Sequence, residues 1–308
     1  MALLPEQTTA RTFPHHSRGN VGCVEPSRWG TPDMWSPLRT VLVRTPTSIG
    51  SFVRDGHWRE PDPGLLLDQH TEFVALLRSL GCDVIVTDPV DGLVDAVYTH
   101  DPMTMTPYGA ILYQMCKPVR AAEPAVMRAD LERLGVPILG ELTGDAFSDG
   151  GDKVWLDERT FVIGRGYRTS RAAVDQIRAL LQPHGVDVIS VDLPHFLGPD
   201  AVLHLMSVVS PLDRDLAAVY EPLAPVALLE LLDERGIERI TVDEDEFTTQ
   251  GANILAVGPR RVVLAAGNDK VHAKLEVAGV EVHVFDGSEV AVKGDGGPTC
   301  LTQPLWRA

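Results

Sequence analysis

The hydrophobic residues of this chain follow an order that repeats five times. In each repeat, apolar residues at helical spacing lead into a glycine and then into a short strand rich in β-branched residues. The five segments read LLRSLGCDVIVTD, LERLGVPILGE, LLQPHGVDVISVD, LLDERGIERITVD and LEVAGVEVHVFD, with their glycines at Gly81, Gly135, Gly185, Gly236 and Gly279. Successive glycines are 54, 50, 51 and 43 residues apart. A period of this length predicts a chain of five similar units.

Each unit is predicted to combine one helix with several strands. The helix of the first unit is expected over 71–80, and its glycine is expected to take the left-handed conformation that ends many helices. Further strand-like runs lie at 39–44, 111–115, 160–164, 253–257 and 261–266.

Two folds of the α/β class fit such an alternation of strands and helices. A doubly wound sheet gives no reason for five near-equal periods. Its only glycine-rich candidate, GRGYRT over 164–169, lacks the third glycine of a dinucleotide-binding turn. The pattern therefore favours a five-bladed α/β propeller with its units around one axis. We expect residues 31–308 to form a single domain and residues 1–30 to form an N-terminal extension.

Composition narrows the functional classes. The chain has 308 residues, of which 44% are hydrophobic, so it can bury a full core. Its formal charge of -16 disfavours nucleic-acid binding and favours a small cationic partner. No apolar run approaches the ~20 residues of a membrane span, and the N-terminus lacks a secretory signal. The cysteines show neither zinc-site spacing nor disulfide density, which favours the cytoplasm. Both a monomer and a homodimer are compatible with the sequence.

The segment after each repeated strand is irregular and holds a chemically distinctive residue. These residues are Asp101, Asp149, His204, Asn253 and Cys300, and they follow their unit's glycine by 20, 14, 19, 17 and 21 residues. Pseudo-symmetry predicts that they meet at one end of the axis. A thiolate is a nucleophile, a histidine moves protons and carboxylates hold a cation, so the set predicts an active site.

Each of these residues also has a structural interpretation when taken alone. A single cysteine is often a small buried hydrophobe, Asp149 in SDGGD could form a turn, and His204 lies between two leucines. Cys300 differs because two glycines and a proline precede it in KGDGGPTCLT, which is typical of a rigid turn. The shared repeat position of the set favours the functional interpretation.

Five motifs in order resemble those of the guanidine-modifying pentein superfamily, which includes arginine deiminase, glycine amidinotransferase and dimethylargininase. They are SPLRTVLVRTP, VYTHDP, SDGGD, HLMS and GDGGPTCLT, and they extend from Ser36 to Pro304. The resemblance implies a pentein propeller that hydrolyses a guanidino group through a covalent thiouronium intermediate. It implies no metal or organic cofactor.

Within this superfamily, two features of the sequence are more similar to the dimethylargininase branch than to the others. Arginine deiminases and amidinotransferases typically carry an aspartate two residues after the histidine, whereas this chain has Met206. FVIGRGYRTS over 161–170 is similar to a dimethylargininase stretch whose arginine binds the substrate's α-carboxylate. The implied reaction converts Nω-methylated arginine, or arginine, to citrulline and an amine. Gly297 and Pro298, in contrast, are closer to the deiminase pattern.

The resemblance also implies roles for particular residues. It assigns catalysis to Cys300, His204 and Asp149, and substrate binding to Asp101, Arg168, Asp295 and Ser207. Cys300 is the expected nucleophile, His204 moves protons and Asp149 orients His204. Asp101 is expected to contact the guanidinium, and Arg168 the α-carboxylate.

Three other functions stay open at this stage. An amidinotransferase would pass the amidino group to an amine, and an arginine deiminase would release ammonia. A non-catalytic propeller would bind a macromolecule, as ribosome-binding members of this fold do. The turn-rich segment 47–64 is the candidate for a lid over the site.

Overall fold

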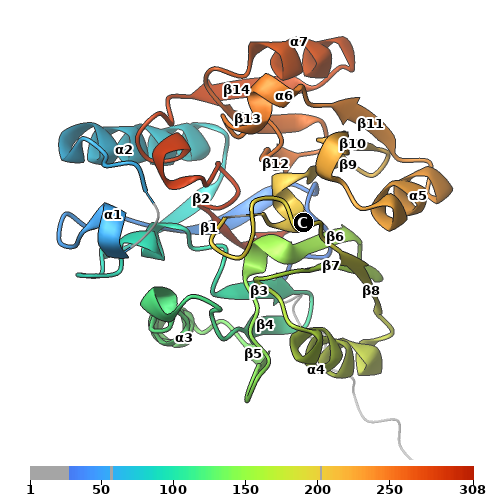
Figure 1. Ribbon diagram of the computed structural model, residues 1–308, viewed down its shortest axis with the longest axis horizontal. Coiled ribbons are helices and arrows are strands. Elements are labelled where there is room, and N and C mark those ends of the chain that lie inside the picture. The colour runs from blue at the N-terminus through green and yellow to red at the C-terminus, as the bar shows by residue number, and fades with distance from the viewer. Residues whose placement is uncertain (1–27, 56–57, 202) are drawn as a thin grey trace, which may run out of the picture.

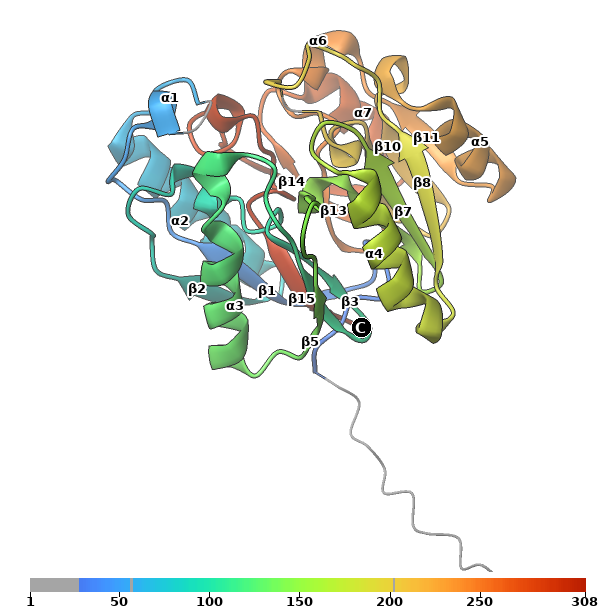
Figure 2. The same cartoon turned by 60° about the horizontal axis from the view of Figure 1, so that its bottom comes forward.

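The computed structural model describes residues 28–55, 58–201 and 203–308. It confirms the predicted five-bladed propeller, with five three-stranded sheets around a central axis (Figure 1). The helices that link the strands lie on the outside, as Figure 2 shows for α3 and α4. Within the described ranges, no helix combines the length and apolar character that crossing a bilayer requires.

Every blade has the same topology. Its first two strands are antiparallel, and an outer helix then leads to a third strand that runs parallel to the second. Four blades are continuous in sequence: β3 (Met103–Thr106), β4 (Gly109–Leu112), α3 (Glu123–Leu134) and β5 (Ile138–Glu141); β6 (Lys153–Asp157), β7 (Thr160–Arg165), α4 (Arg171–Leu181) and β8 (Asp187–Asp192); β9 (Val209–Asp213), β10 (Leu216–Val219), α5 (Val226–Glu234) and β11 (Glu238–Thr241); β12 (Leu255–Gly258), β13 (Arg261–Ala265), α7 (Asp269–Val277) and β14 (Glu281–Phe285).

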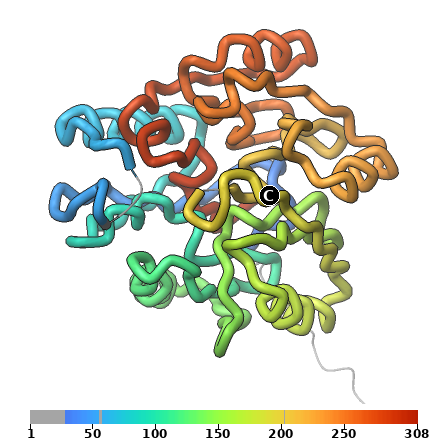
Figure 3. The backbone as a smooth tube through the Cα atoms, viewed as in Figure 1, coloured from blue at the N-terminus to red at the C-terminus, as the bar shows by residue number. Residues whose placement is uncertain are grey.

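The remaining blade is closed by the C-terminus. It contains β15 (Gln303–Arg307), β1 (Leu38–Arg44), α2 (Pro63–Ser79) and β2 (Asp83–Thr87). β15 pairs antiparallel with β1, so the last strand lies beside the first (Figure 3). Because β15 begins three residues after Cys300, this closure fixes the position of the cysteine relative to the first blade.

The repeat glycines have the predicted backbone conformation. Their φ angles are 92°, 70°, 73°, 65° and 76° in chain order, all in the left-handed region that favours glycine. A Cβ on Gly135 or Gly236 would meet nothing within 4 Å. The backbone conformation, and not lack of space, is therefore the reason for glycine at these two positions.

Three predicted elements have boundaries that were wrong by two or more residues, and the other three predicted strands differ by one residue each. The helix expected over 71–80 begins at Pro63, because the Asp62 carboxylate accepts hydrogen bonds from two N–H groups of its first turn. The strand expected over 111–115 ends at Leu112, since the partner strand is preceded by Pro102, which has no N–H to extend the ladder. The strand expected over 253–257 is β12, and Asn253 precedes it with its side chain bonded elsewhere.

The core consists of five hydrophobic clusters, and each contains residues of two neighbouring blades. In one of them, Leu42 and Leu305 of the first blade pack with Met103 and Met127 of the next. Burying such a side chain contributes roughly 1.5–3 kcal/mol, so adjacent blades stabilise one another and hold the loops at the axis in register.

Candidate active site

One cavity near the axis brings together residues from distant parts of the chain. It is lined by Tyr98, Asp101, Arg120, Arg168, His204, Gly294, Asp295, Gly296 and Cys300. Five of the seven predicted site residues are in this lining. Asp149 lies behind it, bonded to His204 and Arg168, and Ser207 lines an adjoining cleft.

The nucleophile candidate Cys300 sits on a turn that is held from two sides. Asn253 donates from Nδ2 to the Cys300 Sγ over 3.3 Å, and its Oδ1 accepts the Thr299 N–H at 3.0 Å. Gly297 packs on the same amide, so that a Cβ there would lie 2.5 Å from the Asn253 Oδ1. Asn253 was marked in the sequence by its repeat position, but its contact with the sulfur was not foreseen.

The Cys300 thiol is neutral in the free protein. Burial raises its pKa to about 12, and the charge of Asp101 adds to this effect, while the hydrogen bond from Asn253 opposes it. A thiol reacts as its thiolate, so this site needs a further positive charge before the sulfur becomes a strong nucleophile. A cation bound beside the sulfur would supply such a charge.

The His204 imidazole is paired with a buried carboxylate. Its Nε2 is 3.2 Å from the Asp149 Oδ2. Burial lowers the pKa of His204, but the hydrogen bond to Asp149 and the charges of Asp152 and Asp101 outweigh burial, and the net effect raises it. The Ser207 hydroxyl accepts the backbone N–H of His204 at 3.1 Å, and Asp152 accepts the N–H of Leu205 at 3.0 Å. These bonds fix the loop that presents the imidazole.

Arg168 and Asp149 form a buried ion pair with unused hydrogen-bonding capacity. The Arg168 Nη1 donates to the Asp149 Oδ2 over 3.1 Å, and the two side chains are 3% and 0% exposed. Within the described residues, the Arg168 Nε and Nη2 and the Asp149 Oδ1 have no hydrogen-bond partner. Buried polar atoms without partners are costly, and Arg168 lines the cavity, so its Nε and Nη2 are available to a ligand.

Asp101 is bonded to a guanidinium that the sequence reasoning missed. The Arg120 Nη1 donates to the Asp101 Oδ2 over 2.7 Å, and its Nε and Nη2 form a bidentate pair with Glu123 at 2.8 and 2.7 Å. Burial alone would raise the pKa of Asp101, but Arg120 and then His204 hold it well below its usual range. Arg120 lies outside the repeat positions, and only the RAAE spacing could have drawn attention to it.

Two predicted substrate-binding residues lie at the margin of the cavity. Asp295 lines it and forms an ion pair with Arg59 at 3.6 Å, and burial raises the pKa of Asp295. Ser207 does not line it and instead positions the His204 backbone. Met206, which stands where deiminases typically carry an aspartate, is buried in the hydrophobic cluster between the third and fourth blades.

Comparison with known proteins agrees with this geometry. The sequence matches the arginine deiminase family model over residues 85–226 and 226–307, which is most of the chain. The chain belongs to the arginine deiminase family. The predicted membership of the guanidine-modifying pentein superfamily is thereby confirmed.

The relatives of this family member named below share less than a third of their aligned residues with it. The N(G),N(G)-dimethylarginine dimethylaminohydrolase of Streptomyces coelicolor is 29% identical over 271 residues, which cover 87% of this chain and 98% of the relative. The uncharacterized protein YkgA of Bacillus subtilis is 28% identical over 240 residues, 78% of this chain and 80% of the relative. A structure of the Pseudomonas aeruginosa DDAH complexed with citrulline has a TM-score of 0.73 at 23% identity and covers 88% of this chain and 100% of that one.

The predicted lid segment, residues 47–64, packs against the turn that precedes Cys300. Trp58 donates from Nε1 to the Asp95 Oδ1 over 2.6 Å and stacks on Tyr98, with ring centroids 5.3 Å apart. The Arg59 N–H donates to the Lys293 carbonyl at 2.9 Å. Described residues of 47–64 therefore lie against the chain that leads to Cys300 without lining the cavity, and their role as a lid stays a prediction.

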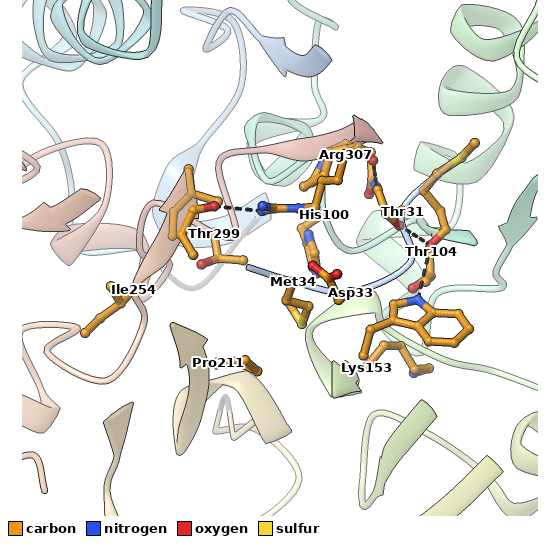
Figure 4. Close-up of a pocket in the computed structure, with 16 residues that line it drawn as sticks. Thr31, Asp33, Met34, His100, Thr104, Lys153, Pro211, Ile254, Thr299 and Arg307 are labelled. Atoms are coloured by element: carbon orange, nitrogen blue, oxygen red, sulfur yellow. Dashed lines mark hydrogen bonds between the residues drawn. The ribbon is translucent and has the colours of Figure 1, made fainter. Parts of the chain in front are cut away.

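A second cavity lies on the axis, apart from the candidate site (Figure 4). Asp33 and Arg307 line it, together with residues of the first strands of the blades. The Asp33 Oδ1 accepts the Ser36 N–H at 2.6 Å, and the Arg307 Nη1 donates to the Ser36 carbonyl over 2.6 Å. The Arg307 guanidinium thus bonds the N-terminal segment to β15, and none of the predicted site residues lines this cavity.

Proposed function

We propose that this chain is a cysteine-dependent hydrolase that converts Nω-methylated arginine, or arginine itself, to citrulline and an amine. The observation that carries the proposal is a single buried cavity lined by the Cys300 sulfur, the His204 imidazole and the Asp101 carboxylate. The dimethylarginine dimethylaminohydrolase relatives and the citrulline complex of a structural neighbour support this reaction class.

Substrate binding begins with the guanidinium. Asp101, kept ionised by Arg120, lines the cavity and accepts hydrogen bonds from the guanidinium nitrogens. These bonds fix the plane of the cation and localise its charge. The cation also offsets the negative field around Cys300, which lowers the pKa of the thiol in the complex.

The chemical steps then use Cys300 and His204 in turn. As the cation binds, the Cys300 thiol releases its proton to solvent. The Sγ then attacks the central carbon while the protonated His204 donates a proton to the departing amine, and a covalent thiouronium remains. A water molecule gives its proton to His204 and attacks the same carbon. The S–C bond breaks, the ureido product leaves and the thiol is restored. No metal takes part in this scheme.

Arg168 binds the far end of an amino-acid substrate. Its Nε and Nη2 are unpartnered and lie on one edge of a planar guanidinium, which matches the two oxygens of an α-carboxylate. Asp149 holds the opposite side of the same group. The assignment of Arg168 to the carboxylate rests on these free donors and on its place in the cavity.

A parallel assay of arginine and its mono- and dimethylated forms tests the proposed function. We expect citrulline release from at least one of them, with methylated arginine preferred, and no turnover by Cys300→Ser with an unchanged circular dichroism spectrum. Preference for arginine with ammonia release would indicate a deiminase. Formation of a new guanidine when an amine is added would indicate an amidinotransferase. Absence of turnover on every form would remove the proposal.

The cellular setting is a second part of the proposal. Cys82, Cys116 and Cys300 are free thiols, and a nucleophilic thiol is preserved in a reducing compartment. We therefore assign the protein to the cytoplasm. Fractionation of native cells with antibody detection would show the protein with cytoplasmic markers.

A further inference from the structure

A cleft of about 370 Å³ adjoins the Cys300 cavity. Asp295 lines both spaces. Asn253 and Ser207 also line the cleft, and these are the side chains that contact the Cys300 sulfur and the His204 backbone. The cleft therefore opens beside both the candidate nucleophile and the candidate proton donor.

The walls of the cleft are partly aromatic. The rings of Phe196 and Phe247 pack edge to face, with centroids 6.0 Å apart and an interplanar angle of 88°. Phe247 is anchored by stacking on Tyr220 at 4.2 Å. Phe196 has a φ of 51°, a left-handed conformation that costs a side-chain-bearing residue of the order of 1–3 kcal/mol. Such strain is characteristic of residues that a binding site holds in place.

The charge of the cleft is negative. Its lining contains the carboxylates of Asp200 and Asp295 and the guanidinium of Arg59, which already pairs with Asp295. Asp200 is exposed and forms no ion pair with any other described residue. An apolar chain with a positive end fits this combination of aromatic walls and one unpaired carboxylate.

We propose that this cleft binds the amine that leaves the guanidine, and that the preferred substrate carries on this nitrogen a chain of several carbons ending in an ammonium group. The inference rests on the proposed function. A guanidinium has three nitrogens: one carries the amino-acid chain toward Arg168, one is held by Asp101, and the third can direct a substituent past Asp295. A methyl group would leave most of the cleft to water, whereas its volume is in the range of small-molecule sites.

The bond changes remain those of the hydrolysis. The Sγ–C bond forms, the C–N bond to the substituted nitrogen breaks, and the His204 proton moves to that nitrogen. A neutral primary amine then occupies the cleft. Water supplies the oxygen of the ureido product and returns a proton to His204, so no further reactant is needed.

The test compares three substrates that share the arginine moiety. They are Nω-(4-aminobutyl)-arginine, Nω-butyl-arginine and Nω-methyl-arginine, with kcat/KM measured for each and the released amine identified by mass spectrometry. We expect release of 1,4-diaminobutane with a kcat/KM above that of the methyl compound. Asp200→Asn should lower the aminobutyl-to-butyl ratio about two- to fivefold, the effect of one partly exposed ion pair. The exposed Asp187, on the strand β8 and outside the cleft, supplies the matched control Asp187→Asn, which should leave the ratio unchanged.

The outcomes of these assays distinguish failure of this inference from failure of the proposed function on which it rests. Phe196→Ala should lower kcat/KM for both long-chain substrates and not for the methyl compound. Cleavage of the methyl compound without cleavage of the aminobutyl compound would overturn the inference and leave the proposed function standing. An aminobutyl-to-butyl ratio that Asp200→Asn does not change would also overturn it. Failure of all three substrates and of arginine would remove both proposals.

Discussion

At the scale of single residues, the site of the free protein contains charged groups and one neutral group, the Cys300 thiol. Arg120 and His204 hold Asp101 in its anionic form, whereas burial keeps the Cys300 thiol neutral. The types of these residues and their repeat positions were predictable from the sequence. The contacts of Arg120 were not, because this residue lies in a short turn before α3, outside the repeat positions, and its partners are set by packing.

The protonation state of Cys300 leads to a direct prediction. With a pKa of about 12, the thiol of the free enzyme should show no thiolate absorbance up to about pH 9. The ultraviolet difference between the wild type and Cys300→Ser, recorded during a pH titration, measures this. A thiolate that titrates near neutrality would contradict the described environment of the sulfur.

Arg168 allows a prediction that separates substrate classes. Arg168→Ala should raise KM for arginine-type substrates about 10- to 100-fold, because a charge-assisted bidentate contact is lost. Agmatine, which lacks the carboxylate, should be affected much less. Arg168→Lys retains the charge without the planar pair of donors and should fall between the two. An equal loss for arginine and agmatine would show that Arg168 does not bind the carboxylate.

At the scale of elements, each outer helix ends at a glycine that turns the chain into the third strand of its blade. The periodicity of the apolar residues predicted the type and order of these elements. It did not predict their ends, because those depend on side chains such as Asp62 at the start of α2 and Asn253 before β12. Capping and loop contacts, unlike periodicity, leave little signal in a single sequence.

The helix-ending glycines carry a measurable part of the stability. Gly236→Ala should lower the free energy of unfolding by about 1 kcal/mol, because alanine is strained at a φ of 65° although no atom obstructs its Cβ. Gly236→Asn should lower it less, since asparagine tolerates this conformation. Urea unfolding of both variants provides the comparison, and equal effects would argue against a conformational cause.

A buried histidine in α2 should make stability depend on pH. Burial lowers the pKa of His70 from 6.5 to about 4, against a smaller opposing effect of its hydrogen bond to the Arg44 backbone. The folded state thus favours the neutral ring. Its contribution is present above pH 6.5 and is lost as the pH falls toward 4, by up to about 3 kcal/mol.

Urea unfolding at neutral and at mildly acidic pH measures this effect. His70→Leu should be less stable than the wild type at neutral pH, yet it should lose less stability on acidification. The partly exposed His272 in α7 offers a matched control, His272→Leu. A pH dependence of His70→Leu equal to that of the wild type would exclude His70 as its source.

At the scale of the whole molecule, the fold creates the site by bringing five loops to one end of an axis. The five repeat glycines were sufficient to predict this gathering, since near-equal periods imply equivalent positions. The pairing of β15 with β1 could not be read from the repeat, because it joins the two ends of the pattern. This pairing brings Cys300, three residues before β15, next to the first blade.

The central claim is that Cys300 forms a covalent bond to the guanidino carbon of the substrate. The most direct measurement is peptide mass spectrometry of enzyme that was mixed with Nω-methylated arginine and rapidly quenched in acid. His204→Asn, which lacks the donor of the proton to the departing amine, should form the adduct more slowly than the wild type. We expect the added thiouronium mass on the peptide that contains Cys300, and none with Cys300→Ser. Turnover without any adduct, or an adduct on Cys116 alone, would contradict the account.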